Sequence, residues 1–130
     1  MSLIKTYNHH VGLLILRVSL GLTMLLAHGL PKIDAFPGLK FPDPIGLGSQ
    51  LSWGAAVAAE VGCSILLVLG LWTRLSLAPL IFTMLIAVFV VHSGDPFAKK
   101  ELGLMYMIGY IALFIAGPGK HSVDWKIQGR

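Results

Sequence analysis

The sequence predicts an all-α protein, a four-helix transmembrane bundle, and three observations carry this prediction. Of the 130 residues, 55% are hydrophobic and only 12% are charged. The mean hydropathy is +0.78, and long apolar runs alternate with short polar or proline-rich connections. A soluble domain of this length needs a larger polar surface. We therefore expect one membrane domain covering residues 1–130, with spans at about residues 11–30, 51–72, 75–92 and 101–117.

The first span, at residues 11–30, is apolar along its length but carries ionisable residues. At roughly 100° per residue, Arg17, His28 and Lys32 fall on one helical face together with Gly21 and Met24. Ionisable groups are costly in hydrocarbon, so they usually face the interior of a bundle, a cavity or one another. The other helices must therefore supply partners for this stripe. We expect the helix itself to stop at Gly29 and Pro31.

The first connection, residues 31–50, holds four of the seven prolines and has no helical or strand period. Its apolar side chains are too many for an open linker in water, so we expect an ordered loop. Two interpretations stay open, a lid folded over the mouth of the bundle and a simple connector resting at the membrane interface.

The second span, residues 51–72, has Gly54, Ala58 and Gly62 at four-residue spacing. Small residues in this pattern allow close approach between membrane helices. Glu60 lies near the middle of the span. An acid at that depth indicates a proton carrier or a polar contact to a ligand.

The third and fourth spans complete the bundle. A tight turn at Thr73 and Arg74 leads into residues 75–92, and residues 97–100 form a connection before residues 101–117. Four spans place both termini on one side. The side of the termini carries slightly more basic residues than the other side. They are Lys5, Arg74, Lys120, Lys126 and Arg130, whereas the other side has Lys32, Lys40, Lys99 and Lys100. We expect the termini in the cytoplasm.

Arg17 has two interpretations. It forms an ion pair with Glu60 inside the bundle, or its long side chain reaches the headgroup layer at its own end of the helix. The basic residues as a group lie at the ends of apolar segments. This placement fits lipid headgroups and topology, so we expect a lipid bilayer as partner and no nucleic acid.

A polar mouth is expected where helices one and three end, because His28, Lys32 and His92 share that membrane face. Lys and His donors suit the carbonyl oxygens of a quinone, and apolar helices suit its tail. Tyr106 and Tyr110, four residues apart, either line a pocket for a flat ring or pack in the core.

Other cofactors fit less well. Two histidines can ligate haem iron, but both lie at helix ends and form only one pair, so we expect no haem. No local ligand spacing indicates a metal site. Cys63, the one cysteine, excludes an internal disulfide and a CxxC redox pair.

Three segments resemble the DoxX family of small membrane proteins. They are Arg17-x-x-x-Gly21 with His28-Gly29-x-x-Lys32, then Glu60-x-Gly62 with Gly70-x-x-x-Arg74, and finally Gly117-Pro118-Gly119-x-x-Ser122-x-Asp124. The resemblance implies a four-helix integral membrane protein of the bacterial inner membrane. The family is named for a subunit of a thiosulfate:quinone oxidoreductase. At matching positions it implies candidate residues at Arg17, His28, Lys32, Glu60 and Arg74. Because Arg74 and Asp124 share a membrane face, we also expect a structural salt bridge between them.

We therefore predict a quinone-interacting subunit of a membrane redox system, its pocket lying between helices one, two and four. Whether it is itself an oxidoreductase stays open. Glu60 and His28 are the catalytic candidates. The ligand-binding candidates are Arg17, His28, Lys32, Glu60, His92, Tyr106 and Tyr110. Electrons come from a substrate or a soluble redox partner subunit.

Two alternatives remain. The first is a non-enzymatic scaffold or assembly factor that docks a partner protein on the small-residue face of helix two. The second is small-molecule transport, for which a homo-oligomer would supply the symmetry that one bundle lacks.

Overall fold

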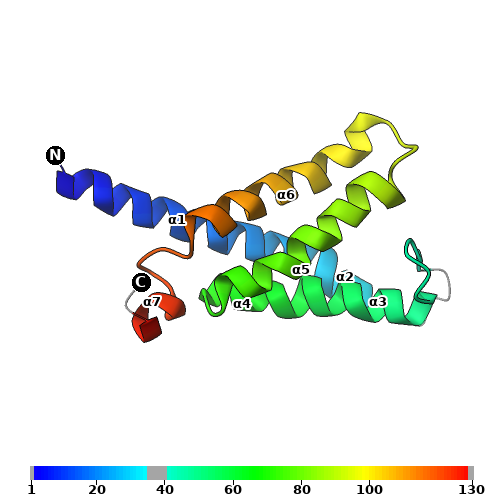
Figure 1. The fold of residues 1–130 in the computed structure, drawn as a ribbon, viewed down its shortest axis with the longest axis horizontal. Helices are drawn as coiled ribbons and strands as arrows, with labels where there is room; N and C mark the ends of the chain where they lie inside the picture. Colours follow the sequence, from blue (N-terminus) through cyan, green and yellow to red (C-terminus); the bar gives the residue numbers. More distant parts are fainter. Residues whose placement is uncertain (1, 35–40, 129–130) are drawn as a thin grey trace.

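The computed structural model describes the backbone of residues 2–34 and 41–128, and the side chains from His9 onward within those ranges. The described chain is helical and forms four long rods that pack side by side, with a short helix at the end (Figure 1). The all-α prediction is confirmed. Three of the rods contain π-helical turns, which are named η here. The elements are α1 Ser2–Met24, η1 Leu25–Gly29, α2 Leu30–Asp34, α3 Ser49–Val57, η2 Ala58–Cys63, α4 Ser64–Leu69, α5 Thr73–Ile86, η3 Ala87–Val91, α6 Phe97–Ala116 and α7 Val123–Gln128.

Helix one comprises α1, η1 and α2, and it continues past Gly29 and Pro31 to Asp34. The prediction that it stops at those residues is wrong. The π turn explains the difference, because Leu30 N–H donates to Leu25 O, five residues back. Pro31 therefore falls where the bonding pattern changes, and its missing N–H and bulky ring disturb less of the helix there.

Helix four begins earlier than expected. Residues 97–100, predicted to be a connection, form the first turn of α6, and Pro96 is the residue that caps its start. Proline fixes its own φ and has no N–H to leave unpaired, so it fits the entrance to a helix.

Helices one and two pack closely, through glycines of helix one. A Cβ added at Gly21 would lie 2.5 Å from Val68 Cγ2, and one at Gly29 would lie 2.9 Å from Glu60 O. By contrast, a Cβ on Gly54 or Gly62 would meet nothing within 4 Å. The small residues of helix two therefore do not make this close contact, which corrects the sequence prediction about them.

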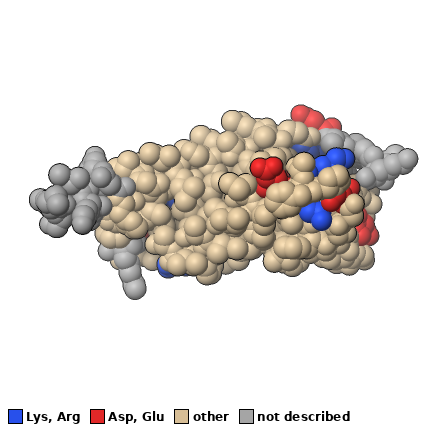
Figure 2. Space-filling view, turned by 90° about the horizontal axis from the view of Figure 1, so that it is seen from above, with Lys and Arg blue, Asp and Glu red and all other residues tan. Residues whose placement is uncertain are grey.

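The core is apolar and centres on helices two, three and four, where Leu67, Leu77, Leu80, Tyr110 and Leu113 are fully buried. Large apolar side chains also cover the outside of the rods, and examples are Ile15, Phe82, Phe89 and Ile115. On the face drawn in Figure 2, charged side chains gather in the half toward α2 and the α5–α6 connection. Most of the remaining surface on that face is uncharged.

Three of the rods are long and apolar enough to cross a bilayer, His9–Asp34, Ser49–Leu69 and Thr73–Val91. The fourth, α6, has 20 residues and runs back along α5 (Figure 1). It carries three charged residues in its first turns, Lys99, Lys100 and Glu101. An outer surface this apolar is stable against lipid and not against water.

Candidate functional site

A cavity of about 470 Å³ lies between helix two, helix three, the end of helix one and the loop at residues 41–47. Alanines and larger apolar side chains form most of its wall. Five polar residues interrupt that wall, and they are Lys32, Ser52, Glu60, Thr83 and His92. A small-molecule site has this volume and this balance of many apolar and few polar groups. We call it the Lys32 cavity.

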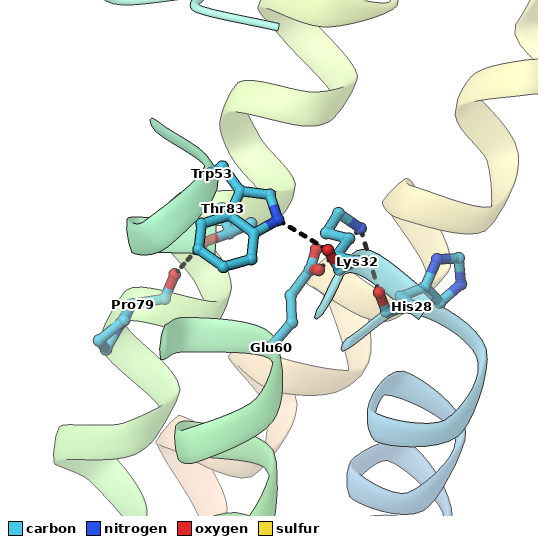
Figure 3. Close-up of polar contacts among 6 residues, drawn as sticks. All are labelled: His28, Lys32, Trp53, Glu60, Pro79 and Thr83. Atoms are coloured by element: carbon cyan, nitrogen blue, oxygen red, sulfur yellow. Dashed lines mark hydrogen bonds and ion pairs between the residues drawn. The ribbon is translucent and has the colours of Figure 1, made fainter. Parts of the chain in front are cut away.

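An ion pair lies on the wall of the Lys32 cavity. Lys32 Nζ is 2.7 Å from Glu60 Oε2, and the Glu60 side chain is almost fully buried. Figure 3 shows Glu60 reaching from helix two toward Lys32 at the end of helix one. Beyond this ion pair, Oε2 has no hydrogen bond within the described part of the chain. The Lys32 ammonium is therefore the partner that compensates the charge of this buried oxygen.

The position of Lys32 is fixed by two further contacts. Its Nζ lies 3.4 Å from His28 O, one turn back in the helix. Its own carbonyl accepts a hydrogen bond of 2.7 Å from Trp53 Nε1 on α3 (Figure 3). The end of helix one is therefore tied to the start of helix two, and the ammonium is held at the cavity wall.

π-helical turns surround this region. η1 carries His28 and packs on η2, which carries Glu60. η3 contributes Ala87 and Val91 to the cavity and ends next to His92. A π turn adds one residue to a helix and re-aims the side chains beyond it, and such turns are frequent at functional sites.

His28 lies beside the cavity and is not among the residues that line it. Its ring makes an edge-to-face contact with Tyr106, at 5.6 Å between centroids and 88° between planes. Tyr106 in turn lies 5.9 Å from Tyr110. The Tyr110 hydroxyl is buried and has no hydrogen bond with the described residues.

The Lys32 cavity differs from the pocket predicted between helices one, two and four, because helix three lines it in place of helix four. Gly29 brings helix one against the backbone of Glu60 and closes that side. On the other side, small alanines of helix two face helix three, Ala55, Ala56 and Ala59, and leave space. Tyr106 and Tyr110 consequently pack behind His28.

His92 and Lys32 do line the same cavity, as expected for the polar mouth. His92 Nδ1 lies 2.7 Å from Asp95 Oδ2, which orients the imidazole. That hydrogen bond holds the pKa of Asp95 below its usual value.

The loop before helix two covers one side of the Lys32 cavity through Phe41, Pro42, Pro44, Ile45 and Leu47. Asp43 fixes its shape, because its carboxylate accepts hydrogen bonds from Ser52 Oγ, Leu47 N and Gly48 N. The bond from Ser52 and these backbone donors lower the pKa of Asp43. This part of the loop agrees with the lid interpretation. Residues 35–40 lie outside the described residues.

Arg17 is 1% exposed and lies far along the bundle from this cavity. Its Nη1 donates to Leu67 O at 2.9 Å and to Val68 O, and its Nη2 donates to His121 O at 2.7 Å. Both earlier interpretations, an ion pair with Glu60 and a side chain reaching the headgroups, are wrong. Helix two ends at Gly70 with φ of 72°, and Leu67 O, which accepts from Gly70 N–H, accepts from the buried cation as well.

The salt bridge expected between Arg74 and Asp124 is also absent from the described residues. Asp124 accepts from Trp72 N, Thr73 N and Thr73 Oγ1 at 2.8–2.9 Å. Burial raises the pKa of Asp124, but hydrogen bonds from Thr73 and Trp72 outweigh it, so the pKa is lowered. Asp124 thus caps α5 from the tail, and Arg74 Nε donates instead to Phe114 O at 2.9 Å.

Metal-ligating side chains do not converge. Within residues 9–34 and 41–128, no group of three or more His, Cys, Asp or Glu side chains is placed to hold a metal ion.

A small bundle with an apolar outside, buried charges and a cavity near one end defines a helical integral membrane protein. The chain belongs to the DoxX family, whose model matches residues 12–93. This range includes Lys32, Glu60 and His92, and it ends before α6 begins.

One curated relative is an uncharacterized protein of Haemophilus influenzae, 28% identical over 94 residues. The match covers 68% of this chain and 62% of the relative, so the chain spans about three fifths of that protein's length. No solved structure matches the chain.

Proposed function

We propose that the protein is a quinone-interacting subunit of a membrane redox system and that the Lys32 cavity receives the quinone headgroup. The single observation that carries the proposal is the ion pair between Lys32 and Glu60 at the wall of an apolar cavity. The polar oxygens at the edge of a quinone ring match the ion pair, and the apolar tail of the quinone matches the apolar part of the wall.

A bound quinone would accept two electrons from a soluble redox partner, and two protons, to become the quinol. Lys32 can donate a hydrogen bond to a carbonyl oxygen, since an ammonium has three donors, of which Glu60 and His28 O use two. Glu60 lies 2.7 Å from that ammonium and can hold a proton for it. His28 acts as a positioning residue, because its carbonyl, not its ring, faces Lys32.

The test begins with gently purified protein, from which lipids are extracted and quinone is quantified. We expect about one quinone per bundle, and a rise in melting temperature when a short-tailed quinone analogue is added. Lys32→Met and Glu60→Gln should abolish both effects. Lys99→Met is the matched control, an exposed lysine that does not line the cavity. Absence of quinone together with no thermal shift would overturn the proposal.

We further propose that the protein lies in the bacterial inner membrane with its termini in the cytoplasm. The basic residues near the termini support this orientation. A reporter that is active only in the cytoplasm, fused after Arg130, should be active. If a reporter that is active only in the periplasm is active at the same position, the orientation is the opposite of the proposed one.

A second candidate function is that of a scaffold that docks a partner protein. The observation that favours it is the unfilled face of helix two, where a Cβ on Gly54 or Gly62 would meet nothing within 4 Å. On this hypothesis Gly62→Leu abolishes co-purification of the partner and Glu60→Gln leaves it intact. On the quinone hypothesis, Gly62→Leu keeps the bound quinone and Glu60→Gln loses it.

A further inference from the structure

A second cavity, of about 450 Å³, lies at the other end of the bundle, where the termini are. It is formed by the turn between α4 and α5, the end of α6, the tail with α7, and the first described side chains of helix one. We call it the Arg74 cavity. It shares no lining residue with the Lys32 cavity.

Arg74 is the permanently charged basic residue in the lining of the Arg74 cavity. Lys120 and Lys126 stand on the segment that forms one of its walls. Asp124 is the acidic lining residue, and its carboxylate already accepts from Trp72 and Thr73. Because those donors hold the Asp124 carboxylate, the Arg74 guanidinium is the charged group that a ligand in this cavity can bond.

Arg74 is held in place for binding. Its Nε donates to Phe114 O at 2.9 Å, and its Nη2 would lie 3.3 Å from a Cβ on Gly117. Within the described residues, no acceptor is bonded to its two terminal nitrogens. A guanidinium fixed at one nitrogen and free at the other two suits the paired oxygens of a phosphate.

His10 adds a second donor to the lining. Its Nδ1 accepts a hydrogen bond of 3.0 Å from Lys120 N, so in the neutral ring the proton is on Nε2. An edge-to-face contact with Trp125, at 5.5 Å, holds the ring.

The residues around the Arg74 cavity indicate that it lies at the depth of the lipid headgroups. Trp72 lines the cavity with its side chain 58% exposed, and Leu75, also in the lining, is 71% exposed. Tryptophan collects at the interface between water and hydrocarbon, and an exposed leucine beside it fits lipid chains. Trp72 has φ of 49°, a costly conformation for a large side chain, and the hydrogen bond from its N–H to Asp124 helps to hold it.

We propose that the Arg74 cavity binds the phosphate of an anionic phospholipid headgroup, with Arg74 as the main contact and the acyl chains along Leu75. Basic pockets at the ends of membrane helices recognise such headgroups. The proposal is independent of the quinone site, and its test uses no quinone.

The test reconstitutes the full chain into nanodiscs of phosphatidylcholine with or without phosphatidylglycerol. Lipid retained after mild delipidation is counted by native mass spectrometry. We expect one retained phosphatidylglycerol, preferred over phosphatidylcholine, and an affinity about fivefold lower in Arg74→Gln. The lipid affinity of Arg74→Lys should lie between those of the wild type and Arg74→Gln, because lysine keeps the positive charge but cannot form two parallel hydrogen bonds to a phosphate. Lys99→Gln, at the opposite end of the bundle, is the control and should retain the lipid.

Melting temperature in detergent separates folding from binding and tests the source of the phosphate. Phosphatidylglycerol should raise it in the wild type, whereas inorganic phosphate at millimolar concentration should not. Equal stabilisation by inorganic phosphate, equal retention of the two lipids by the wild type, or unchanged retention in a folded Arg74→Gln variant would each overturn the proposal.

Discussion

Helix one carries a cation toward each end of the bundle, and the two are treated differently. The terminal nitrogens of Arg17 donate to three backbone carbonyls, from helix two and from the tail. Lys32 meets a single carboxylate, on the wall of an open cavity. A cation enclosed by carbonyls is fixed in place and cannot exchange its partners. A cation that shares one carboxylate beside free space can accept another partner, so we assign structure to Arg17 and chemistry to Lys32.

The largest effect is expected from Arg17→Met. This change removes the side-chain donor of three carbonyls inside the bundle, and it should lower the free energy of unfolding by about 3 kcal/mol. Unfolding in mixed micelles with increasing denaturing detergent measures this. Quinone content per folded molecule should not change, and a loss of quinone without a loss of stability would reverse the roles assigned to the two cations.

A smaller loss of stability is expected at the other end. Lys32→Met alone should cost about 2 kcal/mol, because it leaves the Glu60 carboxylate buried and unpaired. The double variant Lys32→Met with Glu60→Gln should recover most of that loss, since neither charge remains. The same unfolding measurement completes this cycle. Additive losses would show that the two side chains do not interact in the membrane.

The next effect concerns the close contact between helices one and two, which Gly29 makes next to Glu60. Gly29→Ala should cost about 1–2 kcal/mol, because the new Cβ would lie 2.9 Å from Glu60 O. Gly62→Ala is the matched control, with nothing within 4 Å of its Cβ, and should change stability by less than about 0.5 kcal/mol. Comparable losses of stability in the two variants would show that helices one and two do not pack through Gly29.

The smallest effect concerns pH at the end that holds Arg17. The pKa of Asp124 is lowered in the folded state, so its stabilising contribution is present above the ordinary pKa of 3.8 and is lost as pH falls below it. Docking of the tail, followed by Trp125 fluorescence, should therefore weaken in acid in the wild type. In Asp124→Asn docking should be weaker at neutral pH and should change less with acid. An acid transition of the same size in both would exclude Asp124 as its source.

The fold could be predicted because bilayer length and apolar composition dominate it. The prolines, glycines and apolar runs placed the ends of the four rods within a few residues, except that helix one begins at Ser2, nine residues before its predicted start at residue 11. The shared face of Arg17 and Lys32 could not be relied on, because η1 lies between them. A π turn adds a residue and rotates everything beyond it by about 100°. Residues 25–28 are ordinary helix formers, and Gly29 indicates the end of a helix rather than a π turn.

The candidate site was predicted in part for a related reason. Lys32, Glu60 and His92 were identified because each is a polar residue in or next to an apolar run. Their pairing depended on how close the rods approach one another, which Gly21 and Gly29 decide. The Arg74 cavity was not predicted, although Arg74 and Asp124 were singled out, because it is assembled from four separated segments.

The bond from Arg17 to His121 spans 104 positions of the chain. During synthesis, helix one enters the membrane long before that acceptor has been made. The first helix must therefore wait in the translocation machinery, or in lipid, with an arginine only partly satisfied. Asp124, which caps helix three, is made even later. Assembly of the bundle is thus completed from its tail, and bulky fusions placed inside residues 117–124 should reduce the yield of inserted protein more than fusions placed beyond them.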